Sequence, residues 1–157
     1  ERGLATLPTS GQLLTEYGAF LLEREDEEGG LALLDRAIQV APTAAALTAR
    51  AAVYQELART DDAKQDLEVA LEKEPGCLDA LLALGDLYRE QGDVDNARQQ
   101  YEEIVSLTPG VAVGYLRLGA LANQQGDEGE AERYIEEARQ AEPGPLADLD
   151  DTELLEE

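Results

Sequence analysis

The chain has 157 residues, 43% of them hydrophobic, which is enough to bury the core of one compact domain or of a short repeat array. Acidic residues outnumber basic ones 35 to 12, and the formal net charge is −23. This charge repels nucleic acid and anionic lipid, and no apolar run approaches the roughly 18 residues that a membrane helix needs, so we expect neither nucleic-acid binding nor membrane insertion.

Five of the six prolines recur at a near-constant spacing along the chain. The intervals between Pro8, Pro42, Pro75, Pro109 and Pro143 are 34, 33, 34 and 34 residues. Because proline ends a helix and pushes the residue before it out of the helical region, a helix is predicted to end once in each period. A period of this length is typical of one supersecondary unit copied along the chain.

At the N-terminal end, residues 1–10 are predicted to be the remnant of a preceding repeat, so that the chain would be a fragment of a longer array. A native start with a short leading segment is the alternative. In either case the first helix exposes part of its apolar side, including some of Leu13, Leu14, Phe20 and Leu21. We therefore expect a homo-oligomer formed through this N-terminal edge, or occlusion of the edge.

Between the prolines, apolar residues at helical spacing predict helices in pairs. The predicted ranges are 11–24, 30–41, 44–57, 61–73, 78–91, 95–107, 112–125 and 128–141. They form four repeats, assigned to residues 11–43, 44–77, 78–111 and 112–145. The dipeptides Gly92-Asp93 and Gly126-Asp127 are predicted turns, in which the aspartate caps the following helix.

The last segment, residues 146–157, follows a Pro-Gly-Pro break and mixes acidic with apolar side chains. This pattern predicts a ninth helix over about 146–156 that caps the fourth repeat. A solvated acidic tail is the alternative, because acidic and apolar residues in alternation often stay disordered.

The aligned columns resemble the tetratricopeptide repeat, whose pattern combines a Leu-Gly pair, a tyrosine, two alanines and a closing proline. The third repeat supplies Leu81, Leu84, Gly85, Tyr88, Ala97, Tyr101, Ile104 and Pro109. The fourth supplies Tyr115, Leu118, Gly119, Ala122, Ala131, Ile135, Ala138 and Pro143. The first two repeats are looser, and Arg50 occupies a usually apolar column. The resemblance covers roughly residues 11–144 and implies an all-α, right-handed superhelix (an α-solenoid) of about four antiparallel helix pairs plus the capping helix.

The residues that most chemistry requires are missing. There is no histidine, the commonest general base and metal ligand, and the single cysteine, Cys77, cannot form an internal disulfide. Gly29-Gly30 lacks the strand and the lysine of a phosphate loop, and the acidic run at 148–153 lacks the glycine of a calcium loop. The sequence therefore predicts no enzyme, no cofactor and no metal site. The compartment stays open, with the cytoplasm slightly favoured.

The resemblance implies that first-helix residues of each repeat line a concave peptide-binding groove. The implied groove residues are Thr15, Ala19, Leu22, Thr48, Ala49, Ala52, Gln55, Leu82, Asp86, Arg89, Leu116, Arg117, Ala120 and Asn123. Arg89 and Arg117 are candidates to hold one acidic group of a ligand. The alternative is that both arginines only pair with neighbours such as Asp86.

Three functions remain compatible with the sequence. The leading hypothesis is a non-catalytic scaffold that binds a peptide or helix of another protein in the groove. The second is a structural module that assembles with itself by stacking through its open repeat edges, and the third is a regulatory or targeting module of a larger protein. The acidity fits plain solubility, a basic partner or a salt-adapted source.

Overall fold

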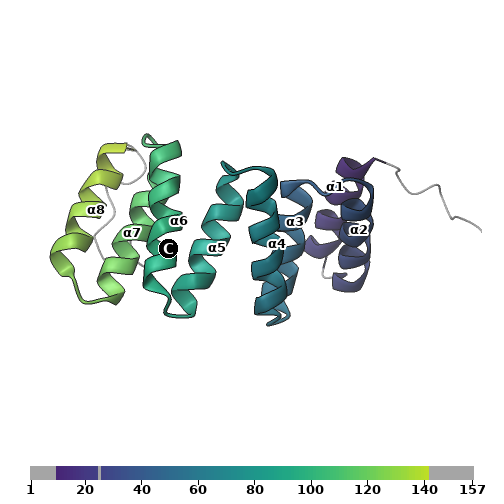
Figure 1. The fold of residues 1–157 in the computed structure, drawn as a ribbon, viewed down its shortest axis with the longest axis horizontal. Coiled ribbons are helices and arrows are strands. Elements are labelled where there is room, and N and C mark those ends of the chain that lie inside the picture. The colour runs from purple at the N-terminus through teal and green to yellow at the C-terminus, as the bar shows by residue number, and fades with distance from the viewer. Residues whose placement is uncertain (1–9, 25, 142–157) are drawn as a thin grey trace, which may run out of the picture. The chain divides into compact units, whose positions relative to one another are not determined.

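The computed structural model describes residues 10–24 and 26–141, and within them every regular element is an α-helix (Figure 1). The helices are α1 (Gly11–Glu23), α2 (Glu27–Val40), α3 (Ala44–Glu56), α4 (Thr60–Lys73), α5 (Leu78–Glu90), α6 (Val94–Leu107), α7 (Val113–Gln124) and α8 (Glu128–Ala141). The predicted all-α class is confirmed. The predicted N-terminal remnant, up to residue 9, and the predicted capping helix lie outside the described residues.

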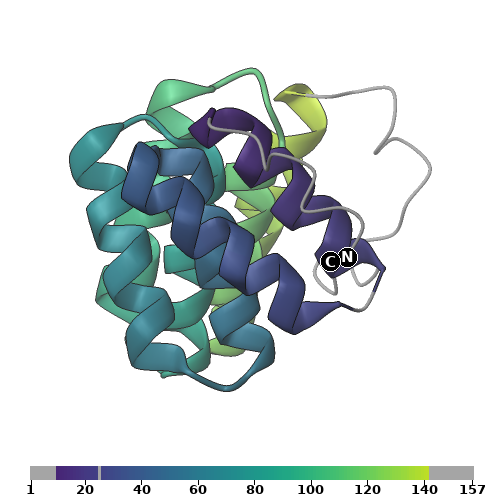
Figure 2. The same cartoon turned by 90° about the vertical axis from the view of Figure 1, so that its right-hand side faces the viewer.

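The chain divides into two compact units, the first ending at Ala83 and the second beginning at Leu84, so that the division falls inside α5. In the first unit α1 packs on α2, α3 packs on α4, and α2 also contacts α3. Figure 2 shows α1 and α2 side by side in the purple part of the ribbon. In the second unit α7 packs on α8 and α6 contacts α7. Most of these contacts join helices that are neighbours in the sequence, and in the first unit α1 also contacts α3.

Small residues let the paired helices of the first unit approach closely. A Cβ atom added to Gly18 of α1 would lie 3.1 Å from the Cγ of Leu34, and one added to Gly30 of α2 would lie 2.6 Å from the Cγ of Leu22. Leu14 and Leu34 are fully buried at this contact. The glycines therefore set the separation of the two helices, and the leucines fill the space between them.

Turn chemistry ends one helix and begins the next, as the sequence predicts. Gly92 and Gly126 have φ angles of 76° and 79°, in the left-handed region that glycine adopts without strain. Asp93 accepts a hydrogen bond from the backbone N–H of Asn96 at 3.4 Å, and Asp127 accepts one from the backbone N–H of Glu130 at 3.0 Å. Both aspartates cap the helix that follows them.

The sequence-based start of α2 is wrong, and the structure shows which apolar residues of α1 are exposed. The helix α2 begins at Glu27 rather than at residue 30, because the side chain of Asp26 accepts the backbone N–H of Gly29 at 3.0 Å and so starts the helix earlier. Of the apolar residues named for the open edge, Leu13 and Phe20 are exposed, whereas Leu14 is fully buried. It packs with Leu33 and Ala37 of α2 and with Ala46 of α3. The exposed leucine of α1 is Leu13.

Candidate functional site

Three helices of the second unit bring polar side chains together around Asp86. The hydroxyl of Tyr101, on α6, donates a hydrogen bond to Oδ1 of Asp86, on α5, at 2.7 Å. The Nε atom of Arg117, on α7, lies 3.2 Å from the same oxygen, and an Nη atom of Arg89 lies 3.8 Å from it. Asp86 is therefore shared by a phenol and two guanidinium groups. The pairing with Asp86 that the sequence left as an alternative is present for both arginines.

The charges of this cluster do not cancel. Two guanidinium groups face one carboxylate, which leaves a local excess of positive charge in a chain whose net charge is −23. The side chains remain partly open to solvent, with exposed fractions of 30% for Arg89, 18% for Arg117 and 25% for Asp86. The Nε–H of Arg117 is buried and, despite its ion-pair distance to Asp86, donates no well-directed hydrogen bond.

Tyr101 is held as a neutral donor in this arrangement. Its ring is fully buried beneath α5, where a Cβ atom added to Gly85 would lie 2.5 Å from the ring. Burial, followed by the hydrogen bond to Asp86, raises the pKa of Tyr101 far above its ordinary value of 10.0. The hydroxyl therefore stays protonated at physiological pH and keeps Asp86 facing the two arginines.

In the first unit, α1 and α3 border a cavity of about 370 Å³. Gln12, Thr15 and Glu16 of α1 line one side of it, and Thr43 and Ala45 line the other. Short side chains such as Ala45 and Thr15 leave this space open. The structure thus places a hollow beside Thr15, one of the residues that the sequence assigns to a groove, but it shows no ligand contact there.

The other predicted groove residues lie on the first helices of their pairs. Ala52 and Asn123 are exposed, Ala120 is buried, and the remaining residues are half-buried. Leu22 packs over Gly30 in the contact between α1 and α2. The hydroxyl oxygen of Thr48 is buried and has no hydrogen-bond partner. Of the predicted set, ion pairs bring together Asp86, Arg89 and Arg117.

A second polar cluster, in the first unit, was not predicted. Arg50 of α3 donates from Nε and Nη2 to the two carboxylate oxygens of Asp66 on α4, at 2.7 Å and 2.8 Å, and from Nη1 to Asp35 on α2, at 2.7 Å. Asp66 is only 6% exposed, and its hydrogen bond is the main reason that the pKa of Arg50 is raised. The unusual arginine in an apolar column was the only signal of this cluster in the sequence.

Arg50 and Asp66 line a cleft of about 270 Å³, together with Tyr54, Gln65 and Val69. All of the donors of Arg50 named above are already satisfied by carboxylates. We therefore assign the Asp35–Arg50–Asp66 cluster to the packing of three helices.

The described part of the chain offers no other site of these kinds. It contains no group of three or more His, Cys, Asp or Glu residues arranged to hold a metal ion. None of its helices has both the length and the apolar character needed to cross a membrane.

Consecutive helices that pack in pairs, with glycine at their closest contact and an aspartate cap at the turns, define an all-α helical-repeat protein. Residues 47–112 match the family model described as tetratricopeptide repeat. These residues therefore carry tetratricopeptide repeats, and the resemblance seen in the sequence is confirmed. A search of curated proteins finds no match.

Solved structures support the same fold. A crystal structure of MamA has a TM-score of 0.76 and 22% sequence identity, over 87% of this chain and 80% of that chain. A tetratricopeptide repeat protein from Parabacteroides merdae has a TM-score of 0.80 and 22% identity, over 97% of this chain and 59% of that one. A thermophilic repeat protein from Thermus thermophilus has a TM-score of 0.72 and 20% identity, over 93% and 79%. At these identities the similarity establishes the fold alone.

Proposed function

We propose that this chain is a non-catalytic protein-interaction scaffold, which binds a peptide or helix of another protein along the first helices of its repeats. The repeat family supports this class of function, because stacked helix pairs present extended surfaces to partners. The observation that carries the proposal is the cluster of Arg89, Arg117 and Asp86, where one carboxylate is shared by two guanidinium groups.

The chemistry of the cluster selects an acidic group on the ligand. A guanidinium group has five N–H donors. The oxygen atoms of Asp86 therefore occupy only some of the N–H donors of Arg89 and Arg117. An aspartate, glutamate or C-terminal carboxylate of the ligand would accept hydrogen bonds from the remaining N–H donors. Its negative charge would balance the excess positive charge of the cluster. Elsewhere the acidic surface repels such a ligand, so the cluster would also fix where along the chain the acidic group binds.

The test begins with random 12-residue peptides displayed on phage and selected on the full chain. We expect the selected peptides to share an acidic position, and replacement of that residue by its amide to weaken binding about tenfold or more, because charge-assisted hydrogen bonds are lost. The double variant Arg89→Gln, Arg117→Gln should bind the parent peptide more weakly by a similar factor. It should bind the amide peptide as tightly as the parent chain does, which would identify the acidic group of the peptide and the two arginines as partners.

The matched control is Arg133→Gln on α8, where the side chain is 58% exposed, pairs with Glu130 and lies 4.7 Å from the centre of the Tyr134 ring. This variant should bind the selected peptides as the parent chain does. Equal affinity of the selected peptides for the parent chain and for the Arg89, Arg117 double variant would refute the assignment. Selection of peptides with no acidic preference would refute it as well.

A further inference from the structure

A row of large apolar side chains is exposed along α1. Leu13, Tyr17 and Phe20 are 51%, 44% and 48% exposed, and their spacing of four and three residues places them on one face of the helix. The rings of Tyr17 and Phe20 are stacked with centroids 6.1 Å apart, and the guanidinium of Arg24 lies 5.7 Å from the Phe20 ring. We name Leu13, Tyr17 and Phe20 the α1 stripe.

The positions of the α1 stripe are covered in the other repeats. In the alignment of the repeats, the residues at the position of Leu13 are Ala46, Ala80 and Gly114, and those at the position of Phe20 are Val53, Leu87 and Leu121. All six are buried. The helix that precedes α7 provides the cover there, because a Cβ atom added to Gly114 would lie 2.8 Å from a methyl carbon of Val105 on α6. At α3 the preceding helix α2 reaches the middle position, through Asp35 and Arg50. The α1 stripe therefore has the form of a surface that a helix covers.

The last helix of the described residues, α8, is a poor match for this surface. Val105 of α6 and Asp35 of α2 mark the positions that reach the following repeat. In α8 the corresponding positions are occupied by Glu136 and Arg139, both charged. Burying charged side chains against Leu13, Tyr17 and Phe20 would cost desolvation. The chemistry of α8 therefore disfavours stacking of α8 of one copy on α1 of another.

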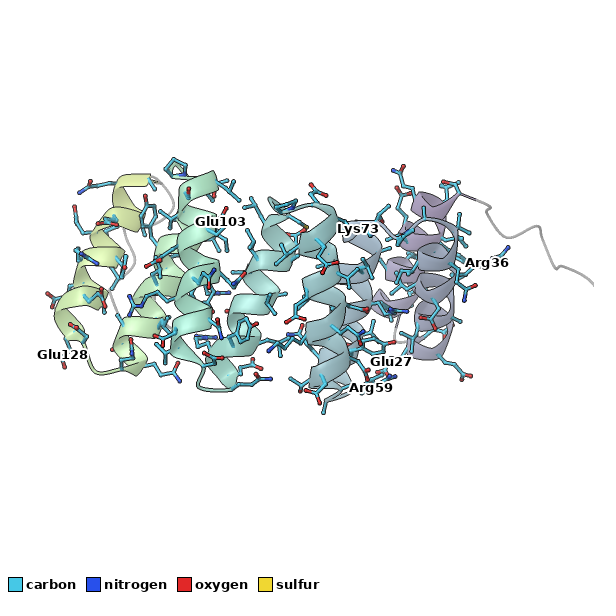
Figure 3. All side chains as sticks on the ribbon, viewed as in Figure 1. Glu27, Arg36, Arg59, Lys73, Glu103 and Glu128 are labelled. Carbon is cyan, nitrogen blue, oxygen red and sulfur yellow. The ribbon has the colours of Figure 1, made fainter. Side chains whose placement is uncertain are left out.

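The surroundings of the α1 stripe favour a partner of opposite charge. Glu16 lies beside it on α1, and Asp26, Glu27 and Glu28 follow at the turn to α2, all exposed (Figure 3 labels Glu27). The nearest basic residue in the sequence is Arg24, the residue that directly follows α1. A second copy of this chain would bring another net charge of −23 to the contact. A basic partner would instead gain from the same field.

We propose that the α1 stripe binds an amphipathic helix of a partner protein, in which an apolar face is flanked by lysine or arginine side chains. The apolar face of the partner helix covers the α1 stripe as α6 covers α7. The basic residues of the partner helix face Glu16 and the acidic turn before α2. The α1 stripe shares no residue with the proposed carboxylate site of Arg89 and Arg117 and selects a ligand of the opposite charge.

The probes are two 14-residue peptides based on α6, the helix that covers Gly114. One has the sequence of Val94–Leu107, and in the other Gln99 and Glu103 are replaced by lysine. Each is titrated to millimolar concentration into the isotope-labelled full chain, and binding is followed by amide chemical shifts. We expect the lysine peptide to shift the signals of residues 12–22 and to bind about tenfold more tightly than the unchanged peptide, with an affinity that falls as salt is added.

The test variant carries Tyr17→Ser and Phe20→Ser, both at exposed positions, and should lose the binding. The control variant carries Val40→Ser and Leu107→Ser, at positions that are 51% and 45% exposed on other helices, and should retain it. Equal affinity for both peptides, unchanged binding by the test variant, or no shift in α1 would overturn the proposal. Sedimentation that shows dimers of the parent chain, abolished by the test variant, would overturn it in favour of a second copy. Binding that survives Arg89→Gln, Arg117→Gln separates this surface from the proposed groove.

Discussion

Arg50 binds Asp66 through two parallel hydrogen bonds, from Nε to Oδ2 at 2.7 Å and from Nη2 to Oδ1 at 2.8 Å. The remaining Nη1 donates to Asp35, so one guanidinium joins α2, α3 and α4. A bidentate pair of this kind requires a specific orientation of the two side chains, which an apolar contact does not. Its net contribution to stability is small as long as both partners are present, because desolvation offsets the attraction.

Removing one partner of the pair should therefore cost much more than removing both. We expect Arg50→Leu to lower the free energy of unfolding by about 2–4 kcal/mol, since Asp66 is left buried and unpaired. The double variant Arg50→Leu, Asp66→Leu should recover to within about 1 kcal/mol of the parent chain. Urea denaturation measures both values. Arg133→Leu, which removes a surface pair, is the control and should cost less than about 1 kcal/mol. A double variant as unstable as Arg50→Leu would contradict this account.

Tyr101 should make the chain sensitive to alkaline pH. Burial and the hydrogen bond to Asp86 raise the pKa of Tyr101 in the folded state. The contribution of Tyr101 to the stability of the fold is therefore fully present below about pH 10 and is lost as the pH rises further. The unfolded chain then releases a proton that the folded chain keeps, at a cost of about 1.4 kcal/mol per pH unit. Urea midpoints between about pH 9 and pH 11 should fall less steeply for Tyr101→Phe than for the parent chain. Parallel curves for the two proteins would show that Tyr101 does not carry this dependence.

Local signals made most of the fold predictable. Proline and Gly-Asp pairs act on the residues beside them, so the ends of most helices followed from the spacing of Pro42, Pro75 and Pro109. The start of α2 was missed because Asp26 caps it, inside an acidic run that offers several possible caps. Whether Leu13 or Leu14 faces the core also depends on how α1 is rotated against α2, which the repeat pattern alone did not settle.

The polar clusters were only partly predictable. Arg89 and Arg117 stood at groove columns, and Asp86 was a candidate partner because it lies one helical turn from Arg89. The partners of Arg50 were not, because Asp35 and Asp66 are two among 35 acidic residues, and only the packing of α2 and α4 against α3 selects them. Long-range pairs between helices leave no trace in local spacing, so a single sequence did not reveal them.

The turn between α3 and α4 contains a position that glycine should improve. Ala58 has a φ of 55°, at the point where the later repeats have Gly92 and Gly126 with φ of 76° and 79°. A residue with a Cβ atom is strained at this backbone conformation, and glycine removes the strain. The free energy gained in this way exceeds the cost of the greater conformational entropy that glycine has in the unfolded chain. We expect Ala58→Gly to raise the free energy of unfolding by about 0.5–1 kcal/mol in urea. Gly92→Ala is the converse change, at a site with open space around it, and should lower stability by a similar amount.

Gly85 should be intolerant of even one methyl group. A Cβ atom there would lie 2.5 Å from the ring of Tyr101, whose hydroxyl is fixed by Asp86, so the ring cannot move away without losing that bond. We expect Gly85→Ala to cost about 1–3 kcal/mol in urea denaturation. Gly110→Ala, where an added Cβ atom meets nothing within 4 Å, is the control and should change little. Equal stability of the two variants would mean that α5 and α6 do not approach as closely as described.

Truncation of the adjacent residues Leu13 and Leu14 of α1 should change stability by very different amounts. Leu14 is fully buried among Leu33, Ala37 and Ala46, so Leu14→Ala leaves a cavity and should lower the free energy of unfolding by about 3 kcal/mol. Leu13 is 51% exposed, and Leu13→Ala should stay within about 0.5 kcal/mol of the parent chain. Urea denaturation of the two variants tests the rotation of α1 directly. A large loss at Leu13 with little change at Leu14 would place the opposite face of α1 against the core and would remove the basis for the α1 stripe.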